Sequence, residues 1–427
     1  FQEVHGPLPV SGGSPVRSER IPERYKAAFE RSAQSYGWPE FGHVAEMKSL
    51  TYHCKRREGI RDDAPPQGLK ELILGTMDEM YKEAKWTLPS DFMEKTHFER
   101  VVRERLDWNS SPGYPYMMRA PTNRVLFKVK EGIPDQDRID MMWSFLQARL
   151  HERDADPVRL FIKPEPHKIK KLENYRYRLI SSVSVLDQII DHMLFGEMND
   201  SLIENWAFTP SRPGWSQLVG GWRAMPVETW TATDKSGWDW SVQPWLLEMA
   251  LEVRQRLCRN PSPLWVELAV WRYKQLFSEC RFITSGGLVL RQRTPGVMKS
   301  GCVNTISDNT LMQVILHLRV SATLGINAGR LIAMGDDVLQ ETPSNEELYL
   351  DTLGQFCHVK QAAHVNEFAG FRFVGKNVEP SYQGKHAFAL LHVNEELLPQ
   401  ICDSYLLLYH RSQRRDYLRT MFQEMGL

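Results

Sequence analysis

The apolar and polar residues of the chain alternate in ways that predict both helices and short strands. Apolar residues recur at helical spacing over 141–150 and 185–198, and each range is predicted to be a helix. A third helix is predicted over 241–257, with Pro244 near its start, where proline is well tolerated. Its buried stripe consists of Leu246, Ala250, Val253 and Leu257.

Two β-like segments lie in the second half of the chain, and both lead into carboxylates. The β-rich run 229–233 ends at Asp234. After a helix predicted over 300–324 come two apolar runs joined by Gly-Asp-Asp. These runs, 331–334 and 338–340, predict a β-hairpin with the carboxylates at its tip. The pattern therefore indicates a protein built from both helices and strands.

The composition is that of an ordinary globular protein, and its charge is balanced overall. Hydrophobic residues make up 42% of the 427 residues and charged residues 25%, which excludes a disordered or fibrous chain. No run approaches the roughly 18 to 20 consecutive apolar residues that a membrane-spanning helix needs, so no intrinsic span is expected. Because 53 Lys and Arg residues balance 53 Asp and Glu residues, any basic surface must be local.

One basic segment, residues 159–178, is called here the basic strip. It carries seven Lys or Arg residues and only two acidic ones, Glu165 and Glu173. In a chain without net charge, the strip predicts a local electropositive surface suited to an anionic ligand. The alternative interpretation is a solvated surface loop.

The acidic residues suggest a site for hard metal ions. If the strand before Asp234 and the Gly-Asp-Asp hairpin are neighbours in one sheet, Asp234 and Asp336 converge at its edge. A site made only of oxygen ligands suits Mg²⁺ or Mn²⁺ and not zinc. Two such ions about 3.5–4 Å apart activate an attacking hydroxyl and stabilise the leaving oxygen in phosphoryl transfer. Taken alone, however, Gly-Asp-Asp is more commonly just a hairpin turn.

A polar segment lies between the two acidic ones. Ser300 and Gly301 stand at the predicted start of a helix, and Thr305 and Asn309 present polar groups along one side of the following turns. Gly301 lets the backbone approach a ligand closely. The alternative is a capped helix whose polar face is merely hydrated. The six cysteines form no Cys-x-x-Cys pair, so neither a disulfide framework nor a zinc site is expected.

In their order, these segments resemble the motifs of the RNA-dependent RNA polymerases of positive-strand RNA viruses. Residues 234–239, Asp-Lys-Ser-Gly-Trp-Asp, look like motif A of that family. The segment 300–309 looks like motif B, and Met-Gly-Asp-Asp at 334–337 looks like motif C.

Further segments are similar to other motifs of the same family. Residues 110–115, Ser-Ser-Pro-Gly-Tyr-Pro, are similar to motif G, and residues 161–180 of the basic strip and just beyond are similar to motif F. Residues 368–373, Phe-Ala-Gly-Phe-Arg-Phe, look like motif E. The sequence of motif F and of the residues after it most resembles that of the sobemovirus, polerovirus and barnavirus branch.

The resemblance implies an α+β fold of the right-hand polymerase kind, with fingers, palm and thumb. The palm would be an antiparallel sheet backed by helices. The expected parts are 1–184 for the fingers with an N-terminal extension, 185–244 for the first part of the palm with motif A, 245–290 for a fingers insertion, 291–383 for the second part of the palm with motifs B to E, and 384–427 for a small thumb.

The resemblance also implies catalytic roles. Asp234 and Asp336 would bind two Mg²⁺ ions, for which Mn²⁺ can substitute, and Asp337 would support one of them. Lys360 is the candidate for the basic residue that protonates the pyrophosphate leaving group, with His358 as its rival. An ordinary surface lysine is the alternative interpretation of Lys360.

The resemblance implies that a larger set of residues binds the incoming nucleotide. Asp239 and Asn309, aided by Ser300 and Thr305, would read the ribose hydroxyls, and a carboxylate that accepts from the 2′-OH favours RNA precursors. Lys163, Lys171 and Arg178 of the basic strip would neutralise the triphosphate. The full nucleotide-binding set is Asp239, Ser300, Gly301, Thr305, Asn309, Lys163, Lys171 and Arg178.

Two segments are expected to contact RNA. Ser111, Gly113 and Tyr114 would guide the template strand, although Ser-Pro-Gly-Tyr is otherwise just a turn. Phe371 and Arg372 of motif E would grip the primer strand, although an amphipathic strand packed on the core would have the same pattern.

The function that the resemblance implies is templated RNA synthesis from nucleoside triphosphates, in the replication and transcription of a positive-strand RNA genome. Expected partners are template RNA, the product duplex, a genome-linked protein primer and other viral replication proteins. The expected location is the host cytoplasm, at membrane-associated replication complexes.

Two other functions are alternatives to this one. A reverse transcriptase shares the palm, but that family usually has an aromatic residue at the position of Asp239 and Tyr-x-Asp-Asp in place of Met-Gly-Asp-Asp. An RNA-binding protein with a degenerate polymerase fold is disfavoured because competent side chains fill all the metal and ribose positions.

Overall fold

The computed structural model describes residues 7–10 and 17–427. Residues 1–6 and 11–16 of the expected N-terminal extension lie outside the described residues. The helices are α1 (Glu23–Ala33), α2 (His43–Cys54), α3 (Gln67–Met80), α4 (Lys95–Arg105), α5 (Asn123–Leu126), α6 (Gln136–Glu152), α7 (Ile169–Leu172), α8 (Val185–Glu204), α9 (Trp238–Ser241), α10 (Pro244–Leu257), α11 (Pro263–Phe277), α12 (Thr305–Leu324), α13 (Glu346–Leu353), α14 (Gln383–Leu391), α15 (Leu398–Leu408) and α16 (Arg415–Glu424).

A four-stranded antiparallel sheet lies at the centre of the part of the molecule that carries the acidic residues. Its strand order is β10–β5–β9–β8. The strands are β5 (Thr231–Lys235), β8 (Leu331–Met334), β9 (Asp337–Gln340) and β10 (Val359–His364). The predicted hairpin is confirmed as β8–β9, and the strand that leads into Asp234 is confirmed as the direct neighbour of β9. The expected antiparallel sheet is therefore present.

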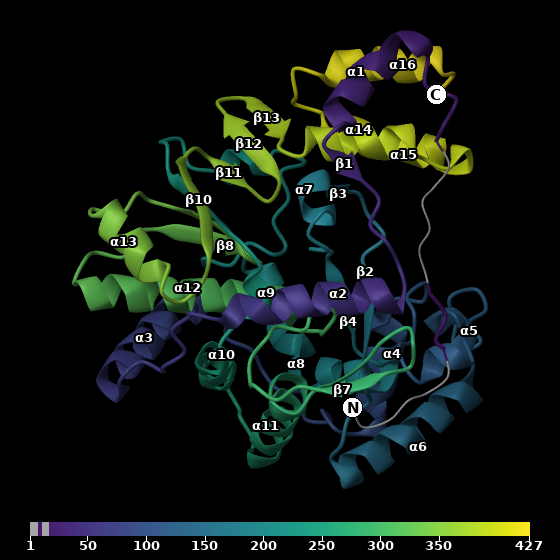
Figure 1. Ribbon diagram of the computed structural model, residues 1–427. Coiled ribbons are helices and arrows are strands. Elements are labelled where there is room, and N and C mark those ends of the chain that lie inside the picture. Colours follow the sequence, from purple (N-terminus) through teal and green to yellow (C-terminus); the bar gives the residue numbers. More distant parts are fainter. Residues whose placement is uncertain (1–6, 11–16) are drawn as a thin grey trace.

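This sheet is covered on both faces, because side chains of successive strand residues point to opposite sides. Ala333 and Val338 face a large core shared with the helices, and α12 packs along β8. Ile332 and Leu339 face a second core that includes Trp215. The second core is completed by a small antiparallel sheet, β11 (Glu367–Phe368), β12 (Phe371–Val374) and β13 (Asn377–Pro380), which lies above the central sheet in Figure 1.

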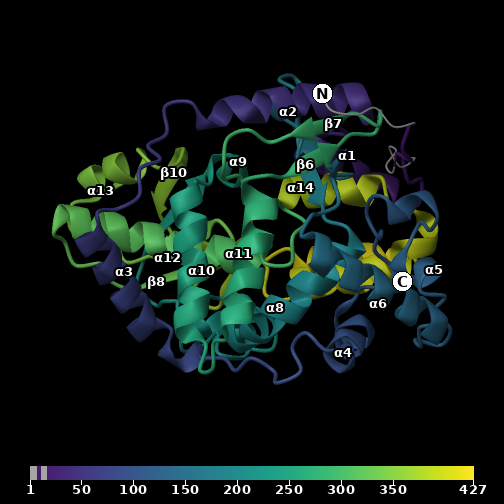
Figure 2. The ribbon, with the colours of Figure 1, turned by 90° about the horizontal axis from the view of Figure 1, so that it is seen from below.

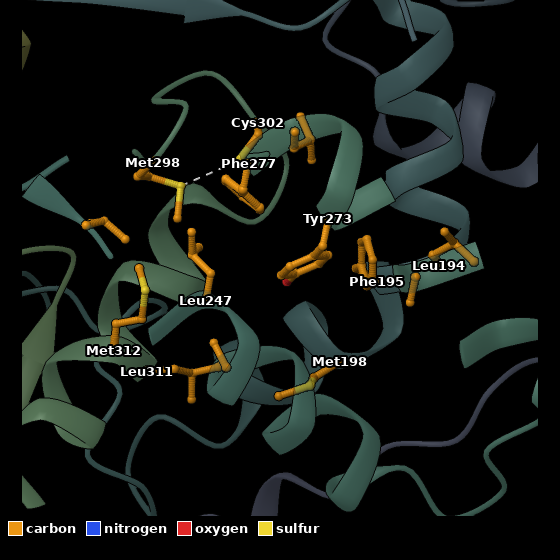
Figure 3. Close-up of a cluster of buried hydrophobic side chains, with 14 of the residues drawn as sticks. Leu194, Phe195, Met198, Leu247, Tyr273, Phe277, Met298, Cys302, Leu311 and Met312 are labelled. Atoms are coloured by element: carbon orange, nitrogen blue, oxygen red, sulfur yellow. Dashed lines mark hydrogen bonds between the residues drawn. The ribbon is translucent and has the colours of Figure 1, made fainter. Parts of the chain in front are cut away.

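Helices α8, α10, α11 and α12 form the layer that supports the sheet (Figure 2). Figure 3 shows how their apolar side chains interdigitate with two residues of the loop before α12. The labelled residues are Leu194, Phe195 and Met198 of α8, Leu247 of α10, Tyr273 and Phe277 of α11, Leu311 and Met312 of α12, and Met298 and Cys302 of the loop. The predicted helices over 141–150 and 185–198 are confirmed, since α6 and α8 contain them.

A buried ion pair fixes the first turn of α12. Arg254 of α10 donates to Asp308 Oδ1 from Nε at 3.0 Å and from Nη2 at 2.9 Å, and both side chains are fully buried. The hydroxyl of Tyr273 donates to the other carboxylate oxygen at 2.6 Å. Removing one partner of such a pair costs about 3–5 kcal/mol, because it leaves the other charge buried and unpaired. The position of α12 is therefore tightly specified.

The helix predicted from Ser300 begins later, at Thr305, so its predicted start was wrong. Residues 300–304 form a loop instead, because they pair with the end of β4 (Leu179–Ser182). The amide of Gly301 donates to the carbonyl of Ser181 at 3.0 Å, and a Cβ atom at position 301 would lie 2.3 Å from that oxygen. Only glycine permits this approach. The helix ends at Leu324 as predicted, and Gly325 follows it with a φ of 64°.

The basic strip belongs to a second four-stranded sheet, with the order β4–β2–β6–β7. Its other strands are β2 (Val158–Ile162), β6 (Arg281–Ile283) and β7 (Val289–Arg291). Between β2 and β4, the strip forms β3 (His167–Lys168) and α7. Strand β3 pairs with β1 (Tyr36–Gly37), so the N-terminal segment lies directly on the strip.

Helix α1 packs with the C-terminal helices, although the whole chain separates them in sequence (Figure 1). Tyr25 and Phe29 of α1 share a core with Leu390, Leu418 and Phe422 of α14 and α16. The amide of Ser18 donates to the carbonyl of Leu391 at 2.8 Å. Among the described residues, no helix is long and apolar enough to cross a membrane.

Candidate active site

The carboxylates of the acidic segments meet at one end of the central sheet. Asp234 is near the end of β5, Asp336 lies in the turn between β8 and β9, and Asp337 is the first residue of β9. The register pairs Thr233 with Val338, so the next residues along, Asp234 and Asp337, face each other across the two strands. The condition that the sequence set for Asp234 and Asp336 to converge, neighbouring strands in one sheet, is therefore met.

The electrostatics of this end of the sheet favour a bound cation. Protein atoms crowd Asp336 and Asp337, and this desolvation, together with the charge of Asp234, raises the pKa of both carboxyls. The pKa of Asp337 is raised to about 6. Lys235 lies buried behind the three acids, and its burial lowers the pKa of its ammonium group. The mutual repulsion of the carboxylates would be relieved by a divalent ion.

The donor set fits Mg²⁺, because it consists of carboxylate oxygens without a thiolate or imidazole. In residues 7–10 and 17–427, no three acidic, His or Cys side chains are already grouped closely enough to hold a metal ion. Asp234 Oδ2 instead accepts a hydrogen bond from Lys360 Nζ at 2.9 Å. Metal binding at Asp234 would therefore replace an ammonium partner by a metal ion.

The two rival proton donors lie in different surroundings. Lys360 sits at an irregularity of β10, between the residues that pair with Lys235 and Asp234, and its exposed ammonium group reaches the carboxylate. His358 is turned away, since its Nε2 atom is 2.5 Å from the backbone carbonyl oxygen of Arg56. The geometry therefore favours Lys360 over His358.

Asp239 and Asn309 form a direct pair. Asn309 Nδ2 donates to Asp239 Oδ1 at 2.9 Å, and Asn309 Oδ1 accepts from Trp238 Nε1 at 2.9 Å. The indole thus fixes the orientation of the amide. Burial and the charge of Asp336 raise the pKa of Asp239 to about 6. The residues expected to read the ribose are brought together beside the carboxylate cluster.

The other residues of the 300–309 segment have different surroundings. Ser300 Oγ accepts from the amide of Ser181 at 3.1 Å, and Gly301 lies against the same residue. Thr305, the first residue of α12, is half-buried. Thr310, one residue beyond Asn309, has a role that the sequence did not reveal, because its Oγ1 accepts from the amide of Gly335 at 2.9 Å and so joins α12 to the hairpin turn.

Two cations of the basic strip, together with one from α14, surround a single acid. Glu165 accepts from Arg178 Nη1 at 2.6 Å and from Lys385 of α14 at 2.9 Å, and it lies 3.4 Å from Lys163. Burial opposes the ionisation of Glu165, but these three cations outweigh it and lower its pKa to about 2. Arg178 is also close enough to Asp239 to lower the pKa of that carboxyl. The strip is therefore an ordered surface beside the carboxylate cluster.

Lys171 is a half-buried cation of the strip without an acidic partner among the described residues. Its ammonium group has no ion pair or hydrogen bond with a described residue. Burial and the neighbouring charges of Arg176, Arg178 and Lys360 lower its pKa to about 8. Such a concentration of uncompensated positive charge favours the binding of an anion.

Two arginines beyond the predicted set meet at the same place. Arg56 Nη2 donates to Ser236 Oγ at 2.9 Å, and Arg176 donates to the same hydroxyl. Ser236 follows Asp234 and Lys235 at the end of β5. Neither guanidinium has a carboxylate partner among the described residues. In the sequence, Arg56 stands in the basic run Lys55–Arg56–Arg57. Nothing in the sequence indicated that this run folds against residues 234–239.

Lys299 is a second functional candidate that the sequence did not reveal. It is fully buried, and its Nζ atom donates to Gln292 Oε1 at 2.5 Å, to the Val297 carbonyl at 3.0 Å and to the Gly296 carbonyl at 3.2 Å. Burial lowers the pKa of Lys299 to about 8, and the three acceptors satisfy its ammonium group. The lysine thereby holds the loop that precedes Ser300.

The loop held by Lys299 also fixes Asp239. Val297 has a φ of 63°, an unfavourable conformation for a β-branched residue. In this conformation the amide of Met298 donates to the carbonyl of Asp239 at 2.8 Å, and the amide of Val297 donates to that of Val242 at 2.9 Å. Lys299 is therefore a positioning residue that joins the 300–309 segment to the 234–239 segment.

We expect Lys299→Met to lower the unfolding temperature by several degrees and to reduce the turnover rate of nucleotide incorporation about threefold, because three buried acceptors lose their donor. Thermal unfolding and steady-state kinetics measure these effects. Lys274→Met is the matched control, since Lys274 is an exposed lysine of α11 whose ion pair with Glu279 contributes little. Unchanged stability and turnover in Lys299→Met would contradict the positioning role.

The turn expected to guide the template lies against the start of α8. Gly113 has a φ of 69°, and a Cβ atom there would lie 2.9 Å from Ser184 Cα. Ser111 Oγ accepts from the amide of Gly113 at 3.2 Å, and Tyr114 packs against the apolar cluster of Leu8, Ile283 and Val289. The exposed side chain of Ser111 is the part of this turn most open to solvent.

The residues expected to grip the primer lie on opposite faces of β12. Phe371 packs with Phe373 against the core between the two sheets, with a ring-centroid distance of 6.4 Å. Arg372 is exposed between them. The strand thus alternates between packed and exposed side chains, and Arg372 and Val374 are its exposed residues.

Comparisons with known proteins identify the family and the fold of the chain. Residues 130–353, more than half of the chain, match the family model described as viral RNA-directed RNA polymerase. The Sicinivirus 3Dpol RNA-dependent RNA polymerase has a similar structure, with a TM-score of 0.72 at 15% identity over 100% of this chain and 95% of that one. This likeness confirms the expected right-hand polymerase fold.

The resemblance to the sobemovirus and polerovirus branch is also confirmed by relatives in sequence. Protein P1-P2 of pea enation mosaic virus-1 is 30% identical over 96% of this chain, and replicase polyprotein P2AB of cocksfoot mottle virus is 30% identical over 77% of it. The chain spans only 38% and 36% of the length of these two relatives. Because the family model matches more than half of the chain, the chain belongs to the viral RNA-directed RNA polymerases.

Proposed function

We propose that this chain copies an RNA template into RNA from nucleoside triphosphates and releases pyrophosphate, as part of the replication and transcription of a positive-strand plant virus genome. One observation carries the proposal: the acids Asp234, Asp336 and Asp337, the Asp239–Asn309 pair and the cations of the basic strip converge at one end of the central sheet. Membership of the polymerase family supports the same reaction.

The proposed parts of the hand follow the boundaries expected from the sequence. The palm is made of 185–244 and 291–383, the fingers of 1–184 with the insertion 245–290, and the thumb of 384–427. Because α1 shares a core with α14 and α16, this portion of the N-terminal extension would move together with the thumb.

Two Mg²⁺ ions, or Mn²⁺ as a substitute, would be held by Asp234 and Asp336, with Asp337 supporting one of them. When bound, the ions lower the pKa of the attacking hydroxyl and stabilise charge on the leaving oxygen. Lys235 stays behind the carboxylates as a buried positive charge that limits their repulsion. Lys360 holds a proton at Nζ beside Asp234 and donates it to the pyrophosphate as that group leaves.

The nucleotide would be oriented by two groups of side chains. Asp239, held by Asn309, accepts a hydrogen bond from a ribose hydroxyl, and Ser300, Gly301 and Thr305 line the approach to it. Lys163, Lys171 and Arg178 would bind the triphosphate, together with the newly identified pair Arg56 and Arg176. Positioning of this kind accounts for most of the catalysis in phosphoryl transfer.

RNA would enter against the Ser111–Gly113–Tyr114 turn, and Arg372 would contact the primer strand. We propose template RNA, the product duplex, a genome-linked protein primer and other viral replication proteins as partners. The proposed location is the host cytoplasm at membrane-associated replication complexes.

The proposal is tested by incorporation of labelled nucleotides on an RNA template with Mg²⁺ or Mn²⁺. We expect ribonucleotides to be incorporated efficiently, deoxyribonucleotides poorly, and neither in the presence of a chelator. Preferential incorporation of deoxyribonucleotides would instead indicate a reverse transcriptase, and RNA binding without incorporation would indicate a degenerate polymerase fold.

Arg178→Ala should raise the nucleotide KM about tenfold, roughly 1.4 kcal/mol, with little change in RNA affinity, because the arginine serves the triphosphate and not the template. Steady-state kinetics and RNA-binding titrations measure the two effects. Lys170→Ala is the matched control, since Lys170 is an exposed cation of the same strip outside the proposed set. A fall in RNA affinity at constant KM would make the strip a phosphate-backbone surface instead.

A further inference from the structure

A cavity of about 600 Å³ lies between α1 and the C-terminal helices α14, α15 and α16, and it contains none of the residues of the candidate active site. Its volume is within the range of about 300–1,000 Å³ typical of small-molecule sites. Figure 1 shows the surrounding helices at the far end of the molecule from α3 and α13. The cavity is therefore a separate feature that the proposed reaction does not use.

Aromatic side chains form much of the cavity wall. They are Phe29 of α1, His386 of α14, Tyr405 and Tyr409 of α15, and Tyr417 of α16. The rings of Tyr405 and Tyr409 are nearly parallel, with an interplanar angle of 10° and a centroid distance of 6.3 Å.

Hydrogen bonds hold these rings in place. Tyr409 OH lies 2.9 Å from His386 Nδ1, and Tyr405 OH donates to the carbonyl of His386 at 3.2 Å. Burial lowers the pKa of His386 to about 4, so its imidazole is neutral at physiological pH. The wall is thus a preformed, uncharged aromatic surface of the kind on which a nucleobase stacks.

Two cations also line the cavity. They are Arg31 of α1 and Arg414, which precedes α16. Neither guanidinium has an ion pair or hydrogen bond with a described residue, whereas the nearby Arg24 pairs with Glu424. Gln383 and Gln413 add amide groups that both donate and accept hydrogen bonds. Planar aromatic walls, free guanidinium groups and side-chain amides together match a base with an attached phosphate.

We propose that this cavity is a second nucleotide-binding site, in which the base stacks against the Tyr405–Tyr409 wall and the phosphate is bound by Arg31 and Arg414. A free nucleotide and the terminal nucleotide of an RNA strand share this chemistry. The ligand would bridge α1 and the C-terminal helices, because one arginine comes from each side.

The other side of α14 gives this site a connection to the basic strip. Gln383, His386 and Ala387 face the cavity, while Lys385 of the same helix binds Glu165 at 2.9 Å. Glu165 in turn holds Arg178. A ligand that shifts α14 would thus alter the surroundings of Arg178, and by linkage a nucleotide at the active site would change affinity at the cavity by the same factor.

The test is photolabelling of the full chain with two probes, 8-azidoadenosine triphosphate and a short RNA with a photoreactive 5′-terminal base, followed by mapping of the labelled peptides. We expect labels on residues 405–417, and at least a tenfold loss of this labelling in the double variant Arg31→Ala, Arg414→Ala. Arg415→Ala is the matched control, because this exposed neighbour does not line the cavity. Labelling by the first probe alone indicates a free nucleotide, and labelling by the second alone indicates an RNA end.

Absence of label from 405–417 with both probes, or equal labelling in the double variant, overturns the proposal. Both arginines are exposed, so the variants should fold, and their unfolding temperatures verify this. Labelling at the active site is scored separately on peptides that contain residues 163–178 and 300–309. Failure of the second site is thereby distinguished from failure of the proposed polymerase function.

Discussion

Asp336→Asn should remove nearly all nucleotide incorporation while leaving the fold and the RNA affinity almost unchanged. The substitution keeps the size and shape of the side chain, replaces one acceptor oxygen by a donor NH2 group and removes the charge. Asp336 lies in the turn between β8 and β9, where it packs against no core, and its pKa is raised by desolvation and by Asp234. A neutral amide there cannot offset the charge of two metal ions, whereas the native turn conformation is preserved.

Incorporation on a primed RNA template, thermal unfolding and RNA binding together measure this prediction. Asp351→Asn is the matched control, because Asp351 is an exposed acid of α13, close to the sheet but away from the carboxylate cluster. Retention of more than about a tenth of the activity, which is roughly 1.4 kcal/mol of barrier, would show that Asp336 is not a central metal ligand.

Asn309→Ala should weaken the preference for ribonucleotides over deoxyribonucleotides about 30-fold. The amide of Asn309 donates to Asp239 and is itself oriented by Trp238, so its loss frees the carboxylate that would accept from the 2′-OH. A hydrogen bond to a charged group contributes about 2 kcal/mol, which corresponds to roughly this factor. Only the ribonucleotide loses a partner, because a deoxyribonucleotide lacks the 2′-OH.

Single-nucleotide incorporation with paired ribo- and deoxyribonucleotides gives the two kcat/KM values that are needed. Asn327→Ala provides the control, since it makes the same chemical change in the exposed loop beyond the opposite end of α12. Equal losses for both sugars would assign Asn309 a structural role and leave ribose selection to other residues.

The parts of this site that the sequence predicted are those encoded by local patterns. The β8–β9 hairpin follows from two apolar runs around turn residues, and α8 follows from apolar residues at helical spacing. From the sequence, the pairing of the strand before Asp234 with the hairpin was only a condition for the carboxylates to converge, and the structure contains this pairing as β5–β9. The expected metal chemistry of the carboxylates thus suggested a long-range contact that hydrophobic periodicity cannot indicate.

The parts that escaped prediction depend on contacts between distant segments. Helix α12 starts five residues late because Ser181 competes for Ser300 and Gly301 through hydrogen bonds. Lysine is usually a surface residue, and only the fold reveals that three acceptors surround the buried Lys299. Arg56 reaches Ser236 across 180 residues of chain. Local propensity contains no information about such partners.

The pairing of β1 with β3, together with the packing of α1 on the C-terminal helices, closes a circle of contacts that includes the central sheet. The circle runs from the central sheet through the C-terminal helices, across α1 and β1 to the basic strip, and back to the sheet (Figure 1). Among the described residues, non-covalent contacts close this circle, including the two-residue pairing of β1 with β3 and the ion pair of Lys385 with Glu165. A linear RNA can thread such a circle by its end, whereas a covalently closed RNA circle can be loaded only when these contacts open. Linear templates should therefore be copied far sooner than circular ones of the same sequence.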